Sequence, residues 1–172
     1  MEAYFDNSAT TIVTDSVKDI VVKTMTEDFG NPSAMHMVGV KAEKYIKEAQ
    51  ENIAKILKVD PKEIFFTSGG TESNNMAIIG TAMANKRKGN KIITTSVEHS
   101  SVLATMKYLE EQGFEVIYLP VDRYGVVQME ALEKEMTEDT ILVSTMYVNN
   151  EVGAIEPVGE IGQYIKLSLI HI

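Results

Sequence analysis

The stretch EIFFTSGGTESNN, residues 63–75, contains the pattern that decides the fold. Its first five residues (63–67) form a short apolar run, which is typical of a strand buried on both faces. The glycine pair Gly69–Gly70 follows, and a helix is predicted from about Thr71 to Asn85. A strand, a tight turn and a helix in direct succession form the repeating unit of an α/β protein.

The same alternation continues along the rest of the chain. Three more apolar runs predict strands, at residues 91–95, 115–119 and 140–146. Apolar residues at helical spacing predict helices over about 15–28, 38–57, 100–112 and 128–136, and another from about Val158. The fold class expected from this alternation is α/β, with a largely parallel sheet of four strands and flanking helices.

Composition excludes several classes of protein. The 172 residues carry a net charge of −9, which argues against general binding to nucleic acid or to anionic membranes. No apolar run approaches the roughly 20 residues of a membrane span, and the first residues lack a leader pattern, so we expect a soluble, cytoplasmic protein. The chain has no cysteine, which excludes disulfides, thiolate zinc sites and a cysteine nucleophile within it. No metal site is expected, because His36, His99 and His171 are scattered along the sequence.

A first candidate for chemistry is the turn at residues 68–75. Ligands of parallel α/β sheets bind where strand ends meet helix starts, and this turn falls at such a point. Two glycines allow close approach, and the helix start with the Thr71 and Ser73 hydroxyls supplies the parts of a phosphate cradle. A capped turn without a ligand fits the spacing equally well. The sequence has neither the Gly-Lys-Ser/Thr of a P-loop nor the dinucleotide pattern G-x-G-x-x-G here.

Two further candidates follow later strands. His99 lies just after a predicted strand, where it can face a ligand as an aromatic plate or an acid–base group, although a structural or capping histidine is favoured by spacing alone. Asn149, Asn150 and Glu151 make a polar loop, suited to an Asx turn or to a ligand hydrogen bond. Taken alone, segments 6–11 and 30–36 indicate turns.

Five stretches together resemble the cysteine desulfurases, in the class V aminotransferase family of pyridoxal-phosphate enzymes. They are YFDNSATT (4–11), GNPSAMH (30–36), FTSGGTESNN (66–75), EHSSV (98–102) and VNNEVGAIEPV (148–158). Their order and spacing match the family over about residues 3–166. The resemblance implies an incomplete aminotransferase-like large domain. Residues 1–14 would belong to the active-site mouth or small-domain region, and residues 15–166 to the first part of the pyridoxal-phosphate-binding large domain.

The resemblance also implies roles for individual residues. Gly70 and Thr71 would bind the phosphate of pyridoxal 5'-phosphate. His99 would stack on the pyridine ring and act as the catalytic residue that assists proton transfers. Asn150 would hydrogen-bond the phenolic oxygen. The substrate mouth would include Asn7, Ala9, Thr10, Asn31 and His36.

Members of this family convert L-cysteine to L-alanine and leave a persulfide sulfur on an enzyme cysteine. The sulfur then passes to an acceptor or scaffold protein for iron–sulfur clusters or thio-cofactors, and the enzymes are homodimers. The chain departs from the pattern after Asn150. It lacks the aspartate for the pyridinium nitrogen, a nearby glutamine, the Ser-x-His-Lys segment whose lysine forms the Schiff base, and the later cysteine. The fragment alone is therefore expected to be inactive.

The chain end suggests a cut. Residues 167–172, LSLIHI, are the translation of CTG TCT CTT ATA CAC ATC, the end of a transposase-type sequencing adapter, so we expect an adapter-derived tail. The family's strand order, 3-2-4-5-6-7-1, would allow the last three predicted strands to pair and would leave the strand at 63–67 without its neighbour. An unstable or aggregating chain is expected from this loss.

Two other functions stay open. Within the family, the parent protein could be a different class V aminotransferase or a selenocysteine lyase, which the missing cysteine loop would distinguish. Outside enzymes, a non-catalytic binding protein could retain a degenerate phosphate site. The presence or absence of the Ser-x-His-Lys segment in the complete gene would separate these classes.

Overall fold

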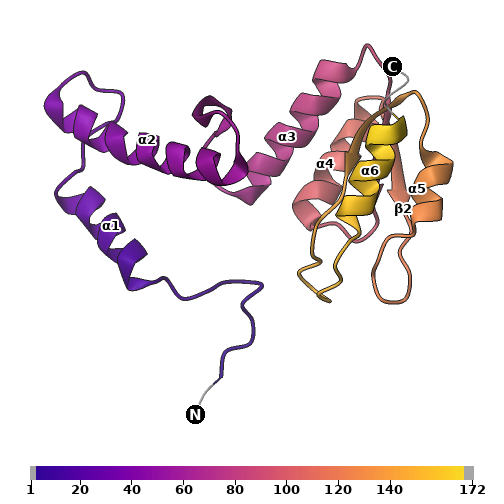
Figure 1. The fold of residues 1–172 in the computed structure, drawn as a ribbon, viewed down its shortest axis with the longest axis horizontal. Coiled ribbons are helices and arrows are strands. Elements are labelled where there is room, and N and C mark those ends of the chain that lie inside the picture. The colour runs from indigo at the N-terminus through magenta and orange to yellow at the C-terminus, as the bar shows by residue number, and fades with distance from the viewer. Residues whose placement is uncertain (1–2, 169–172) are drawn as a thin grey trace. The chain divides into compact units, whose positions relative to one another are not determined.

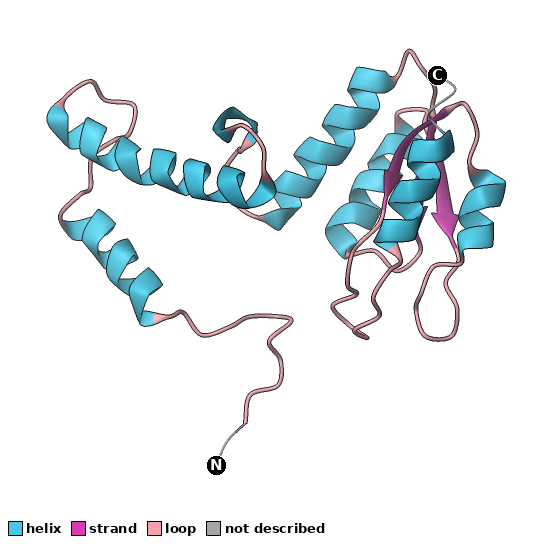
Figure 2. Cartoon of the chain, viewed as in Figure 1, coloured by secondary structure: helices cyan, strands magenta, loops and turns pink. Residues whose placement is uncertain are grey.

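A computed structural model describes residues 3–168 of the chain, which divides into two compact units, Met1–Phe66 and Thr67–Ile172 (Figure 1). The first unit contains α1 (Asp15–Thr26), α2 (Met37–Leu57) and the short 3-10 helix η1 (Pro61–Glu63). The second contains α3 (Gly70–Asn85), β1 (Lys91–Thr95), α4 (Ser100–Glu111), β2 (Glu115–Leu119), α5 (Met129–Glu135), β3 (Thr140–Ser144) and α6 (Val158–Ser168). Figure 2 shows strands only in the second unit. Among the described residues, no helix is long and apolar enough to cross a membrane.

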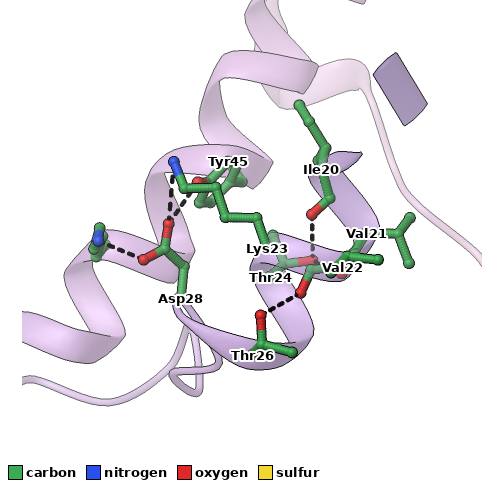
Figure 3. Close-up of polar contacts among 9 residues, drawn as sticks. Ile20, Val21, Val22, Lys23, Thr24, Thr26, Asp28 and Tyr45 are labelled. Atoms are coloured by element: carbon green, nitrogen blue, oxygen red, sulfur yellow. Dashed lines mark hydrogen bonds and ion pairs between the residues drawn. The ribbon is translucent and has the colours of Figure 1, made fainter. Parts of the chain in front are cut away.

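A buried carboxylate joins the two long helices of the first unit. Asp28 follows α1 (Figure 3), and its side chain is fully buried. It accepts a hydrogen bond from the Tyr45 hydroxyl of α2 at 2.6 Å, and its Oδ2 lies 3.7 Å from Lys23 Nζ of α1. The Lys41 ammonium of α2 contacts the other carboxylate oxygen. These partners, Lys41 and Tyr45 first, hold the pKa of Asp28 below its usual range.

The second unit is built on a parallel sheet of three strands in the order β2-β1-β3. Ile92 pairs with Val116 on one side and with Leu142 on the other. This order confirms the predicted pairing of the last three strands. The third of them ends at Ser144, two residues earlier than predicted.

Helices cover both faces of this sheet and bury a core on each. On one face, Ile92 packs against α3 and α4 through Ile78, Val102 and Met106. On the other face, Ile93 lies in a second core with Leu132 of α5 and Ile161 of α6. Successive residues of a strand point to opposite faces, so one apolar run supplies both cores. The α/β fold class with a parallel sheet and flanking helices, expected from the sequence, is confirmed.

The predicted strand at 63–67 is wrong. These residues have no strand conformation, and the sheet has three strands where four were predicted. Phe65 and Phe66 are 75% and 53% exposed. A β-strand needs a hydrogen-bonding neighbour, and no described strand lies beside this run.

Two of the predicted boundaries lie near the ends of the chain, at residues 14/15 and 166/167. Of the expected tail at 167–172, residues 169–172 lie outside the described residues, and α6 continues through Ser168. The proposed boundary between residues 14 and 15 falls at the first residue of α1. Thr14 occupies the N-cap position of that helix.

Candidate functional site

The turn before α3 has the properties of an anion-binding loop. Gly70 and Thr71 are the first two residues of α3 and are exposed. The first N–H groups of a helix have no acceptor within the helix and lie at its positive end. A Cβ added at Gly69 or Gly70 would meet no atom within 4 Å, so there is open space beside this backbone.

Side chains around this turn hold it in one conformation. Thr67 Oγ1 donates to the Gly69 carbonyl at 3.1 Å and bonds Ser73 Oγ at 2.6 Å. The Glu72 carboxylate accepts from the backbone N–H of Ser68 at 2.6 Å and from its hydroxyl at 2.7 Å. The Ser68 bonds lower the pKa of Glu72. This carboxylate is therefore bonded to the residue preceding the glycines.

His99 caps the amino end of α4. Its Nδ1 accepts the backbone N–H of Ser101 at 3.1 Å, and the Ser101 hydroxyl lies 2.9 Å from the same nitrogen. Because Nδ1 accepts, the proton of the neutral imidazole is on Nε2. The capping role that spacing favoured is present, and the exposed ring remains accessible to a ligand.

The two asparagines after β3 divide the roles that the sequence left open. Asn149 Oδ1 accepts the backbone N–H groups of Glu151 and Val152 at 2.9 and 3.0 Å, which makes the Asx turn. Asn150 is exposed, and one of its two amide protons is donated to Glu151 Oε1 at 2.8 Å. Asn150 is therefore the amide of this pair that is available to a ligand.

A chain of hydrogen bonds brings the three predicted ligand stretches together. Asn74 in the second turn of α3 donates from Nδ2 to Ser101 Oγ of α4 at 2.9 Å. Past β1, the Val97 carbonyl accepts Asn149 Nδ2 at 3.0 Å. Gly70, Thr71, His99 and Asn150 thus flank one bonded set of residues at the carboxyl edge of the sheet. Ligands of parallel α/β sheets bind at this edge.

Sequence reasoning assigned no role to three residues here, Asn74, Glu98 and Ser101, and it left Asn149 open between an Asx turn and a ligand hydrogen bond. Each stood inside a quoted motif. Glu98 is only 7% exposed, and burial raises its pKa, with the Glu156 charge adding to the rise. The available signal was that Glu98 and Asn149 each stand directly beside a predicted ligand contact. Their hydrogen bonds reach residues 48 and 52 positions away, and local patterns cannot predict such bonds.

The expected substrate-mouth residues all lie in the first unit. Asn31 Oδ1 accepts the Ser33 N–H at 2.9 Å, and His36 Nδ1 accepts the Gly39 N–H at 3.3 Å as the N-cap of α2. The N–H groups of Ala9 and Thr10 both donate to the Asp6 carbonyl, and Asn7 lies within the same turn. Within the described residues, no group of three or more His, Asp or Glu side chains could hold a metal ion.

The chain is similar to known proteins along nearly its whole length. The family model described as aminotransferase class-V matches residues 3–171. A cysteine desulfurase IscS of Clostridium botulinum is 48% identical over 170 residues, which is 99% of this chain and 43% of that protein. The chain therefore spans less than half the length of this curated relative.

Solved structures have the same fold. A NifS-like protein superposes with a TM-score of 0.92 at 47% identity, over 97% of this chain and 46% of that one. The structure described as SspA in complex with cysteine gives a TM-score of 0.89 at 38% identity, over 96% of this chain and 48% of that one. With a family model matched over nearly its whole length, the chain belongs to the class V aminotransferases.

Proposed function

We propose that the full-length protein containing this chain is a pyridoxal-phosphate-dependent cysteine desulfurase, and that this chain supplies one side of the cofactor pocket. The observation that carries the proposal is the bonded set at the carboxyl edge of the sheet, which joins the three motifs shared with cysteine desulfurases. The 48% identity to a cysteine desulfurase supports the activity, and the relative solved with cysteine supports the substrate.

The residues of the second unit fit pyridoxal 5'-phosphate. The open space at Gly69 and Gly70, the N–H groups at the start of α3 and the Thr71 hydroxyl suit a phosphate. His99 offers an exposed imidazole whose Nε2 carries the proton, and Asn150 retains one amide proton for a phenolic oxygen. When bound, the cofactor withdraws electrons from the substrate amino acid.

The chain's own residues would then bind and orient. Gly70 and Thr71 would hold the phosphate, Asn150 would donate to the phenolic oxygen, and His99 would stack on the ring and assist proton transfers through Nε2. Asn7, Ala9, Thr10, Asn31 and His36 would line the substrate mouth. The reaction converts L-cysteine to L-alanine and transfers its sulfur to an enzyme cysteine as a persulfide. This chain has no cysteine, so it cannot form that persulfide by itself.

The proposal extends to context that the resemblance implies. It includes a homodimer, a cytoplasmic location and a protein that accepts the sulfur for iron–sulfur clusters or thio-cofactors. It also includes residues 1–14 as part of the mouth region, 15–166 as the first part of the large domain, and 167–172 as adapter-derived. Sequencing the source DNA tests the last point, since a continuation other than LSLIHI after Lys166 is expected.

The activity is tested by incubating the full-length protein with pyridoxal phosphate, L-cysteine and a dithiol reductant, and measuring L-alanine and sulfide. Equal amounts of both are expected. Asn150→Ala should lower the rate at least tenfold, whereas Asn85→Asp, at the far end of α3, should not change it. Alanine from selenocysteine alone would indicate a lyase, and bound phosphate without any alanine would indicate a non-catalytic protein.

A further inference from the structure

Two buried polar side chains lie directly before the two predicted ring contacts. Glu98 precedes His99, and Asn149 precedes Asn150; they are 7% and 5% exposed. Glu98 Oε1 accepts the backbone N–H of Met146 at 2.7 Å, and Asn149 Nδ2 donates to the Val97 carbonyl at 3.0 Å. We call these two bonds the Glu98–Asn149 latch. Each side chain reaches from its own segment to the backbone of the other.

The latch lies beyond the paired part of the strands. The backbone register between β1 and β3 ends at the pair Thr94 and Ser144. Past that pair, the segment 96–99 is bonded to β2 by the Ser96 N–H, which donates to the Leu119 carbonyl at 3.0 Å. Beyond the last backbone pair of β1 and β3, the latch joins the segment that follows β1 to the loop that follows β3.

Glu98 and Asn149 are held in this arrangement because breaking their hydrogen bonds would leave buried polar atoms without partners. The Thr95 hydroxyl also donates to Glu98 Oε1 at 3.0 Å, so one carboxylate oxygen receives two donors. A buried carboxylate that loses its donors is strongly destabilised. Asn149 uses both ends of its amide, since Oδ1 closes the Asx turn while Nδ2 is donated to Val97.

We propose that Glu98 and Asn149 are positioning residues, which fix His99 and Asn150 relative to one another before the cofactor binds. The proposal rests on the proposed function for its consequence, because a pre-formed pair of contacts lowers the cost of ordering the pocket around the ring. Its structural content, the coupling of the segments 97–101 and 146–152, does not depend on the cofactor.

The first test uses the cofactor-free full-length protein and amide hydrogen exchange. Asn149→Asp keeps the Asx-turn acceptor and removes the donor to Val97, so residues 97–101 should exchange faster although the change lies in the other segment. Glu98→Ala should likewise speed exchange over 146–152. Glu98→Gln retains an acceptor for Met146 and should restore protection. Asn85→Asp, which also removes an amide donor to a carbonyl within the second unit, is the matched control.

The second test measures the dissociation constant of pyridoxal phosphate and the pH midpoint of its bound absorption band. Asn149→Asp and Glu98→Ala should weaken binding about tenfold and move the midpoint in the direction that Asn150→Ala moves it. Glu98→Gln should keep both near wild type. A purely structural defect would lower thermal stability without moving the midpoint.

The outcomes are separable. Wild-type exchange in both segments of Asn149→Asp and Glu98→Ala overturns the latch. Altered exchange with an unchanged dissociation constant and midpoint overturns the positioning role. Coupled exchange in a wild-type protein that binds no pyridoxal phosphate overturns the proposed function and leaves only the structural coupling. If Glu98→Ala does not fold, the same measurements are made on Asn149→Asp and on Thr95→Val, which removes a donor to Glu98 Oε1. These two variants then decide between the results.

Discussion

Histidine caps the amino end of two helices in this chain. His36 accepts the Gly39 N–H before α2, and His99 accepts the Ser101 N–H before α4. A side chain that caps through Nδ1 leaves its Nε2 edge available. A cap and a cofactor contact are therefore compatible at one residue, and His99 can perform both.

Two substitutions at His99 separate these roles. Asparagine is among the best N-cap residues and lacks an aromatic ring, whereas alanine provides neither. We expect His99→Ala to lower the free energy of unfolding of the full-length protein by about 1 kcal/mol, and His99→Asn to stay close to wild type. Both variants should bind pyridoxal phosphate more weakly and should change the absorption of the bound cofactor. Equal loss of stability in both variants would contradict the capping role.

The raised pKa of Glu98 makes a pH prediction. The folded state keeps the Glu98 carboxyl protonated to a higher pH than the unfolded chain does, in which the pKa of this group has its ordinary value of 4.5. Stability from this group is fully present below that value and is lost as pH rises through the folded pKa. Glu98→Gln removes the titration and keeps an acceptor for Met146. Its unfolding free energy, measured by denaturant from pH 4 to 8, should fall less with rising pH than that of wild type. An identical pH slope in the two proteins would contradict the assignment.

Residue types at the site were predictable, but their partners were not. Gly70 and Thr71 at a helix start and Asn150 after a strand follow from local pattern, and the resemblance supplied their roles. Glu98 and Asn149 form bonds to Met146 and Val97, which are 48 and 52 positions away. Only the folded sheet brings such distant segments to the same edge.

Helices and strands differ in how far the sequence determines them. Helix bonds are local, so the spacing of apolar residues predicted α1 and α2 to within two residues at each end. The run at 63–67 has strand composition, yet a strand depends on a neighbour that no local pattern reports. The predicted strand failed for this reason, and the three runs that have neighbours formed strands.

The α1–α2 pair depends on the Asp28 carboxylate. Asp28→Asn keeps an acceptor for the Tyr45 hydroxyl but places an uncharged amide beside the Lys23 and Lys41 ammonium groups. We expect faster amide exchange in α1 of the full-length protein at pH 7. Asp19→Asn, at an exposed carboxylate of α1, is the control.

The same carboxylate sets an acid limit for this contact. Its folded pKa lies below the ordinary value of 3.8, so its contribution is complete above that value and is lost as pH falls through the folded pKa. The difference in α1 exchange between wild type and Asp28→Asn should therefore shrink only below about pH 4. A difference that shrinks already near pH 6 would show that another group controls the contact.

Many large apolar side chains of this chain are exposed. In the first unit, Met25, Phe65 and Phe66 are 72%, 75% and 53% exposed. Exposed apolar side chains promote association when they form contiguous surface. The 172-residue chain expressed alone should form soluble aggregates in size-exclusion chromatography with light scattering, and Phe65→Lys should reduce them. A monodisperse monomer with one cooperative thermal transition would contradict this expectation.

The proposed function requires that this chain supply one side of a pyridoxal-phosphate pocket. The most direct measurement is a titration of the cofactor-free full-length protein with pyridoxal phosphate, followed by absorption, for wild type and for Thr71→Val. We expect one cofactor per subunit for wild type and a dissociation constant at least tenfold higher for Thr71→Val, which loses a hydroxyl donor to the phosphate. No saturable binding to wild type, or equal affinity for both proteins, would contradict it.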